Sequence, residues 1–293
     1  MTTASVLYDA PGPRAQRRNK LFAVAIVAVI LAMGAWVLWE FSSKGQLTAA
    51  KWHPFLTANL WTTYVLPGAL GTLTAAGASI VLALIFGMVL GLGRLSDSRA
   101  VRWASSVTVE LFRAIPVLIM MLFAYFLFAL YDVFPSRQLA LAGVITGLTL
   151  YNAAVIAEIV RAGVQALPRG QREAAVALGL RPGQTLRVIL LPQAITSMLP
   201  VLVSQMVVVL KDTAIGYQIT FVEMVRQGTN IGATYSNYIP ALILIAVLMI
   251  SLNFALSSLA TRLEGRLRRS RRAPDPLPLS AVIEEDAPGT PTA

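Results

Sequence analysis

The residues most able to do chemistry in this sequence are charged side chains inside or at the ends of long apolar stretches. Glu110 and Arg113 are three residues apart, and Glu158 and Arg161 repeat that spacing further along the chain. On a helix this spacing puts both members of a pair on one face. Charge inside a bilayer is costly and often marks a path for ions or substrate. We therefore interpret these residues as local ion pairs that anchor helix ends or, alternatively, as a gate.

A second group of polar residues is predicted to line a substrate path. Lys211 and Asp212 are adjacent near the end of an apolar stretch, and Thr213 follows them. A basic and an acidic group together suit a ligand that carries both a carboxylate and an ammonium, although a helix-end anchor explains them equally well. Deeper polar candidates could line the same path or bond between helices. They are Asn152, Ser204 and Gln205, and Glu158, nearer a helix end, is a further candidate for the path.

The sequence gives little support for catalysis or metal binding. It has no cysteine and a single histidine, His53, which argues against a thiolate or zinc site. It lacks the Gly-x4-Gly-Lys-Ser/Thr loop that holds nucleotide phosphates, and also a Gly-x-Ser-x-Gly or His-Glu-x-x-His motif. We expect no catalytic residue, no metal and no cofactor on this chain.

These residues are set in a strongly apolar chain. Of its 293 residues 56% are hydrophobic and only 13% are charged, and the mean hydropathy is +0.68. Soluble domains carry roughly 25% charge, so an all-α, polytopic membrane fold is predicted. A spanning helix needs about 20 apolar residues. Six stretches qualify, at about 21–39, 71–92, 109–130, 139–160, 194–210 and 239–260.

The net charge of +10 is interpreted as an orientation signal and not as a nucleic-acid site. Most lysines and arginines fall before the first stretch, between the second and third, between the fourth and fifth, and after the sixth. Basic residues concentrate on the cytoplasmic side of membrane proteins. The sequence therefore predicts that both termini are cytoplasmic and that the surrounding partner is membrane lipid.

The expected organisation follows from these stretches. The first span is read as an uncleaved anchor, because its apolar part is longer than that of a signal peptide. The expected segments are a cytoplasmic arm (1–20), an N-terminal transmembrane helix (21–41), an extracytoplasmic linker with an interfacial segment (42–70), a transmembrane core (71–262) containing the loop 163–192, and a basic, then disordered, cytoplasmic tail (263–293).

The loop 163–192 is the most informative segment. Glu173 to Leu178 contains three alanines, which favour a short helix. Gly179 can supply the left-handed residue that ends such a helix, and Pro182 suits the first turn of a second one. Small residues allow another surface to approach, Glu173 offers a carboxylate to a basic partner, and Leu178 or Leu180 could enter a pocket. The pattern predicts a helical hairpin that another protein can grip.

This segment resembles the EAA loop of permease subunits of binding-protein-dependent ABC importers. The match runs from Glu173-Ala174-Ala175 through Gly179, three residues on, to Ile189-x-Leu191-Pro192, nine residues further. Segments 109–116 (VELFRAIP), 157–163 (AEIVRAG) and 210–213 (LKDT) are similar to stretches of polar amino-acid permeases, and 214–217 (AIGY) looks most like glutamate-type permeases. Together the resemblance covers roughly 71–260.

The resemblance implies the fold, the partners and the transport mode. It implies a five-helix type I permease core with one added N-terminal helix, in a bacterial inner membrane. It implies import of glutamate or a related polar amino acid by alternating access, with two ABC ATPase subunits that bind ATP and Mg, a second permease, the same or homologous, and an extracytoplasmic binding protein. The ATPase-coupling residues that it implies are Gly170, Glu173, Ala174, Ala175, Leu178, Gly179, Leu180 and Pro192.

The alternative is an ion-coupled secondary amino-acid transporter. That class predicts broken helices and paired ionisable residues near the bilayer midplane. The charges of this chain stand nearer the ends of its apolar stretches, which argues against it. A membrane-embedded enzyme is a third possibility that lacks any recognisable nucleophile, base or metal set.

Overall fold

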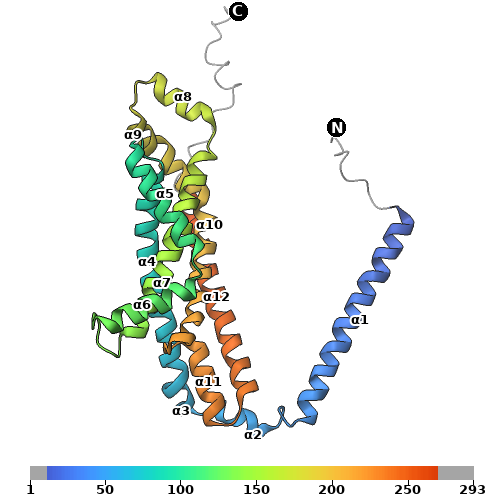
Figure 1. Ribbon diagram of the computed structural model, residues 1–293. Coiled ribbons are helices and arrows are strands. Elements are labelled where there is room, and N and C mark those ends of the chain that lie inside the picture. Colours follow the sequence, from blue (N-terminus) through green and yellow to red (C-terminus); the bar gives the residue numbers. More distant parts are fainter. Residues whose placement is uncertain (1–11, 270–293) are drawn as a thin grey trace, which may run out of the picture. The chain divides into compact units, whose positions relative to one another are not determined.

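A computed structural model describes residues 12–269, and helices account for most of that range (Figure 1). The short 3-10 helices are η1 (His53–Leu56) and η4 (Thr213–Ile219), and the π-helical segments are η2 (Trp61–Val65) and η3 (Thr185–Leu190). The α-helices are α1 (Pro13–Ser43), α2 (Ala49–Trp52), α3 (Ala58–Leu60), α4 (Leu66–Arg94), α5 (Arg99–Ala114), α6 (Val117–Leu130), α7 (Leu139–Gln165), α8 (Arg169–Ala177), α9 (Pro182–Gln184), α10 (Leu191–Asp212), α11 (Met224–Thr234) and α12 (Tyr238–Arg269).

The predicted all-α, polytopic class is confirmed. Five helical segments of the described chain are long and apolar enough to cross a membrane, and a bent pair of helices makes a sixth. The five are Pro13–Ser43, Ala58–Arg94, Leu139–Gln165, Pro182–Ile219 and Tyr238–Arg262. None of the residues of α1 is buried, as expected of a helix whose apolar surface faces lipid or another chain.

Two boundaries differ from the hydropathy prediction. The second span begins at Ala58 rather than near 71, because α3, η2 and α4 run on as one helix. The last helix continues to Arg269 instead of ending near 260. The predicted arm and tail lie partly outside the described residues, at 1–11 and 270–293.

The apolar stretch predicted as a spanning helix at 109–130 is not one continuous helix but part of a bent pair. α5 and α6 meet at an angle of 100°. The cause is Pro116, since a proline disfavours the helical region for the residue before it. Ile115 is accordingly extended, with φ −90° and ψ 128°. In Figure 1 α6 leaves the direction of α5 and projects sideways.

The chain separates into two compact units. Unit 1 comprises Met1–Val65 with Gly228–Leu244, and unit 2 comprises Leu66–Gln227 with Ile245–Ala293. Within unit 1 the ammonium of Lys51 donates to the carbonyl of Ser236 at 2.9 Å, and Asn237 donates from its amide to the carbonyl of Lys51. The Tyr64 and Thr234 hydroxyls lie 3.2 Å apart. These bonds join the segment before α4 to the end of α11.

Small residues bring the helices of unit 2 together. A Cβ at Gly87 would lie 2.6 Å from Cγ2 of Ile156, and one at Gly147 would lie 2.5 Å from Cγ of Met121. A Cβ at Gly91 would lie 2.9 Å from Cβ of Val160 on α7, and one at Gly143 would lie 3.1 Å from Cβ of Tyr125 on α6. The glycine pairs 87/91 and 143/147 thus allow close packing of these helices. This packing places α7 against α4 on one side and α6 on the other, with an apolar core around Val144, Leu148 and Val160.

Candidate functional site

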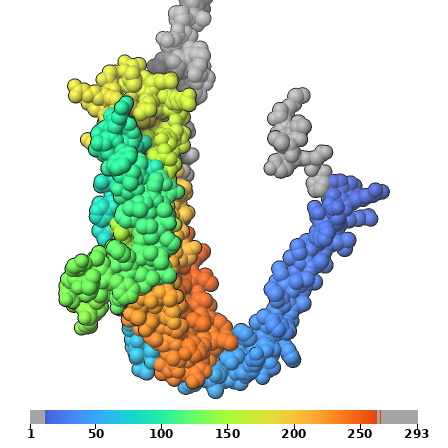
Figure 2. Space-filling view, viewed as in Figure 1, coloured from blue at the N-terminus to red at the C-terminus, as the bar shows by residue number. Residues whose placement is uncertain are grey.

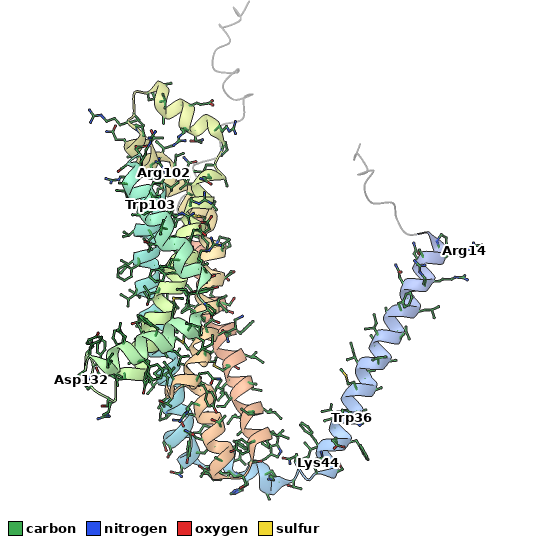
Figure 3. The ribbon with its side chains drawn as sticks, viewed as in Figure 1. Arg14, Trp36, Lys44, Arg102, Trp103 and Asp132 are labelled. Carbon is green, nitrogen blue, oxygen red and sulfur yellow. The ribbon has the colours of Figure 1, made fainter. Side chains whose placement is uncertain are left out.

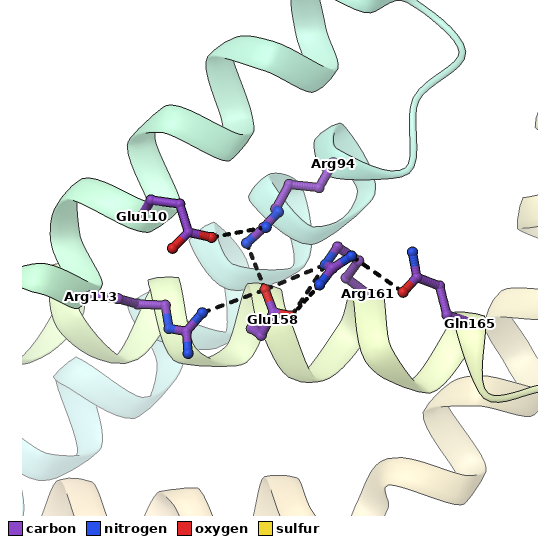
Figure 4. Close-up of polar contacts among 6 residues, drawn as sticks. All are labelled: Arg94, Glu110, Arg113, Glu158, Arg161 and Gln165. Carbon is purple, nitrogen blue, oxygen red and sulfur yellow. Dashed lines mark hydrogen bonds and ion pairs between the residues drawn. The ribbon is translucent and has the colours of Figure 1, made fainter.

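A network of charged side chains joins three helices of unit 2 (Figure 4). The Glu158 carboxylate on α7 lies 2.7 Å from Nη1 of Arg94 on α4 and 2.6 Å from Nη2 of Arg161 one turn further on. Arg113 on α5 approaches the same carboxylate at 3.6 Å. Nη2 of Arg94 lies 3.1 Å from the carboxylate of Glu110, also on α5. One carboxylate thus collects three guanidinium groups from three helices.

The charges pair differently from the local prediction. Glu158 and Arg161 do pair across one turn, but no ion pair joins Glu110 to Arg113 in the described chain. Each of the latter two reaches another helix instead. Because the side chains of Glu110 and Arg113 remain 62% and 41% exposed, the network has a buried inner part and a solvated outer part.

Arg94 is the residue of this network that the sequence analysis missed. Its side chain is only 8% exposed, and its Nε has no hydrogen-bond partner among the described residues. The available signal was its place at the end of an apolar stretch, which we attributed to orientation alone. A buried guanidinium between two carboxylates does more than orient a chain, because it ties α4 to α5 and α7.

Two of the predicted path residues bond to each other. Nε2 of Gln205 on α10 donates to Oδ1 of Asn152 on α7 at 2.7 Å, and the Asn152 amide donates to the carbonyl of Leu148 at 2.8 Å. Asn152 is fully buried. Of the two readings left open, the structure supports a bond between helices for this pair.

The other path candidates are more dispersed. Ser204 is exposed and donates to the carbonyl of Pro200 on its own helix at 3.0 Å. Thr213 is fully buried and donates to the carbonyl of Leu210 at 2.7 Å. Lys211 is exposed, whereas the neighbouring Asp212 is half-buried, so the two face different surroundings. Glu158 belongs to the ion network, at some distance along α7 from Asn152.

The segment 163–192 folds as two short helices joined by a tight turn. α8 covers Arg169–Ala177, which is four residues longer at its start than the predicted helix. Gly179 has φ +75°, the left-handed conformation expected of it. Pro182 begins α9, and the side chain of Gln184 accepts from the backbone N–H of Arg181 at 3.0 Å. The π-helical η3 then leads directly into α10.

The side chains of this segment divide into an inner and an outer set. Ala175 is buried, whereas Leu178 is 80% exposed although it is apolar. A bond of 3.2 Å from Gln193 to Gln171 ties α8 to the start of α10. Figure 2 shows α8, in yellow, on the surface at one end of unit 2. Among the other residues implied for coupling, Gly170, Glu173, Ala174 and Gly179 are exposed, and Leu180 and Pro192 are half-buried.

A buried acid, Glu223, was also missed. It has no exposed surface, and its carboxylate accepts the backbone N–H groups of Val225 at 2.7 Å and Arg226 at 2.6 Å, which caps α11. Burial raises the pKa of the Glu223 carboxyl to about 7, although these two hydrogen bonds and the charge of Arg226 act in the opposite direction. The signal in the sequence was a lone acid in the apolar run 219–225.

The part of the chain that the structure describes contains no cluster of potential metal ligands. No three histidine, aspartate or glutamate side chains lie close enough there to hold an ion. The polar groups of the site are instead paired charges and amides, which can hold helices together or meet a polar ligand.

Comparison with known proteins agrees with this arrangement. The family model of the binding-protein-dependent transport system inner membrane component matches residues 83–269. The chain is 55% identical over 230 residues to the glutamate transport system permease protein GluD of Corynebacterium glutamicum, covering 78% of this chain and 84% of that one. It is 29% identical over 208 residues to the glutamate/aspartate import permease protein GltK of Escherichia coli, covering 69% and 93%.

A solved structure shares the same fold. The crystal structure of an amino acid ABC transporter with histidines matches with a TM-score of 0.64 and 28% identity, over 70% of this chain and 95% of the matched chain. The matched family region contains the ion network and the whole segment from α8 to α10. This chain therefore belongs to the family of binding-protein-dependent transport system inner membrane components, as a multi-pass permease of an amino-acid ABC importer.

Proposed function

We propose that this permease imports glutamate or a closely related polar amino acid. The support is the 55% identity to a permease whose name specifies glutamate, over most of both chains. The substrate would pass through the permease by alternating access, after delivery by an extracytoplasmic binding protein.

The segment 163–192 is proposed to couple this movement to ATP. The observation that carries the proposal is α8, which presents Leu178 almost fully to solvent while Ala175 packs inward. An exposed apolar side chain on a short helix suits a pocket on a partner protein. The left-handed Gly179 fixes the turn that holds this helix out. Two ATPase subunits, each binding ATP and Mg, would grip two such permeases, which are copies of this chain or a homologous pair.

The proposed topology follows from the distribution of basic residues. Both termini and α8 would lie in the cytoplasm, and the 42–70 segment would lie outside. The N-terminal helix 21–41 would be an addition to the permease core 71–262, with the arm 1–20 and the tail 263–293 inside. On this topology the ion network lies towards the cytoplasmic ends of α4 and α7, where the last turns of α5 meet them, and could work as a gate.

The polar residues of α7 and α10 are candidates for the substrate path. Ser204 is exposed from α10, and Lys211, Asp212 and Thr213 end that helix. A basic and an acidic group near the path would suit the two charges of an amino acid. The ion-coupled alternative stays unfavoured. That class predicts paired ionisable residues near the bilayer midplane, whereas the polar pair between α7 and α10, Asn152 and Gln205, is neutral and hydrogen-bonded to itself.

Co-purification tests the coupling proposal. Leu178→Asp should abolish retention of the ATPase when the complex is purified through a tag on this chain. Val133→Asp is the matched control, because it makes the same kind of change at an exposed residue in the connection between α6 and α7. Equal retention of the ATPase by both variants, together with wild-type ATP-dependent uptake, would contradict coupling through α8.

Substrate choice is tested separately in proteoliposomes. Uptake of labelled glutamate by the purified complex and its binding protein should be inhibited by unlabelled glutamate and by related polar amino acids. Inhibition by branched-chain or basic amino acids alone would refute the proposed substrate and leave the coupling proposal untouched.

A further inference from the structure

A cavity of about 660 Å³ lies in unit 2 beside the segment 163–192. It is bounded by the end of α4, the start of α5, the end of α7, and the α8 to η3 region. This volume is in the range of cavities that hold small ligands. The ion network borders the cavity at a single residue, Arg94.

The wall of this cavity is rich in arginine. Five arginines line it, and Asp97 is the only acidic residue among the described lining residues. Figure 3 places Arg102 at the α8 end of α5. We name this cavity the arginine pocket, and its arginines are Arg94, Arg102, Arg169, Arg172 and Arg187.

Most of this positive charge is not neutralised within the described chain. Arg94 is paired with Glu158 and Glu110. Arg102 donates from Nη1 to the carbonyl of Ser96 at 2.6 Å, which steadies the side chain without cancelling its charge. Among the described residues, no ion pair or side-chain hydrogen bond involves the remaining three, which are Arg169, Arg172 and Arg187. Like charges gathered around one cavity repel one another, so an anion between them is stabilising.

Much of the rest of the lining is apolar. Leu92 from the end of α4, Leu95 just after it, Val164 from α7, and Leu186 from η3 contribute to this apolar part. A wall with a basic part and an apolar part suits a ligand that has an anionic group beside an apolar group. Guanidinium groups pair with phosphate through two parallel hydrogen bonds, and basic pockets between membrane helices bind phospholipid headgroups.

Orientation of the chain explains basic residues on this side but not their gathering around one cavity. Arg99 and Arg181 belong to the same two connections and lie outside the lining. They would serve orientation equally well. From the cavity, the three guanidinium groups without an ion pair in the described chain and the apolar part of the wall, we propose that the arginine pocket binds a phosphate-bearing anion.

The proposal is tested on the full-length chain in lipid nanodiscs. In one arm, thermal unfolding is compared in phosphatidylcholine discs with and without phosphatidylglycerol, and native mass spectrometry counts the phosphatidylglycerol molecules retained. In the other arm, inorganic phosphate is titrated into discs of phosphatidylcholine alone. A ligand that binds only the folded chain raises the unfolding temperature.

The variants separate a specific pocket from general attraction. Arg172→Gln with Arg187→Gln removes two pocket charges, and Arg99→Gln with Arg181→Gln removes two charges outside it. The wild type and the second variant should gain several degrees and retain the ligand, and the first should lose most of that gain. If the first double variant is poorly expressed, Arg187→Gln alone should show a smaller loss.

The outcome identifies the source of the phosphate. A gain that depends on phosphatidylglycerol assigns the pocket to a lipid headgroup, and a saturable gain from inorganic phosphate assigns it to a soluble anion. Equal behaviour of both double variants in both arms would overturn the proposal. Because every readout is binding or stability without transport, this result is independent of the proposed import of glutamate.

Discussion

Gln205 on α10 donates a hydrogen bond of 2.7 Å to Asn152 on α7, and the acceptor is completely buried. Burying an amide without a hydrogen bond costs free energy. Removing either side chain would therefore destabilise the other. The bond fixes the register of α10 against α7, which in turn lies against α4 and α6.

A double-mutant cycle measures this dependence. We expect a coupling energy between Asn152→Leu and Gln205→Leu of about 0.6 kcal/mol and at most about 1.7 kcal/mol, the mean and the maximum found for hydrogen bonds between membrane helices. The measurement is the unfolding free energy of the two single variants and the double variant in detergent. Ser204→Ala should change it little, because that hydroxyl bonds to its own helix. Strictly additive single effects would show that the bond contributes nothing.

Glu158→Gln should destabilise the contact of α7 with α4 and α5. The substitution leaves the guanidinium of Arg94, which is 8% exposed, without its closest charged partner. Removing one member of a largely buried ion pair is costly, and we expect a loss on the order of 2 kcal/mol because Glu158 itself is partly exposed.

The control for this variant is Glu110→Gln in the same network. The Glu110 side chain is 62% exposed and lies 3.1 Å from Arg94, so its loss should cost less than about 1 kcal/mol. Thermal unfolding of both variants in detergent gives the comparison. Equal shifts would mean that Glu158 is not the centre of the network.

Gly71→Ala should be among the most damaging single-methyl additions in α4. A Cβ at Gly71 would lie 2.0 Å from the carbonyl oxygen of Val222, and backbone cannot move aside as a side-chain end can. We expect a loss of about 1–3 kcal/mol, as for other overpacked sites.

Gly77→Ala is the matched control on the same helix. No atom other than those of the adjoining helix backbone and chain neighbours lies within 4 Å of a Cβ at that position, and alanine favours a helix by about 1 kcal/mol over glycine. Its unfolding midpoint should therefore stay equal or rise. A loss as large as that of Gly71→Ala would show that glycine in α4 serves flexibility instead of close approach.

Protonation of Glu223 should give the chain a pH-dependent stability. The folded pKa of this carboxyl is raised to about 7 from its ordinary value of 4.5, so the folded chain holds the proton more tightly than the unfolded chain does. Stability should therefore fall as the pH rises from about 4.5 to about 7 and level off above. Each unit by which the folded pKa exceeds the unfolded pKa corresponds to about 1.4 kcal/mol in the free energy of unfolding.

Glu223→Gln provides the comparison for the pH series. It cannot ionise, so its unfolding midpoint should lack that decline while other titrating groups contribute equally to both proteins. Midpoints at half-unit steps between pH 4.5 and pH 8 give the difference curve. A difference that is flat, or that increases in favour of the wild type with rising pH, would contradict the raised pKa.

Local rules predicted the features that local sequence controls. The left-handed Gly179 and the start of α9 at Pro182 depend on residues within a few positions of each other, and both are found where expected. The close approach at the glycine pairs 87/91 and 143/147 also has a local cause, because small residues four positions apart leave a smooth helix face. The lengths of the apolar stretches were enough to predict the number of membrane spans.

Contacts between helices were beyond the same rules. Whether Glu110 pairs with Arg113 or with Arg94 depends on the angle of α5 to α4, which spacing along one helix cannot give. The bend at Ile115 has a local cause in Pro116, but apolar residues on both sides gave one unbroken hydropathy peak. Glu223 was missed because its burial follows from packing around α11 and not from its neighbours in sequence.

The π-helical η3, directly before α10, contains one residue more than a regular α-helical turn would need. A π-helical turn holds more residues than an α-helical turn, so removing one residue from Thr185–Leu190 would restore regular helix and leave the following positions in phase. The same deletion inside α10 would turn Ala194, Met198 and Leu202 by about 100° away from the core that they now fill. Length differences between related chains should therefore be tolerated at η3 and rejected a few residues later.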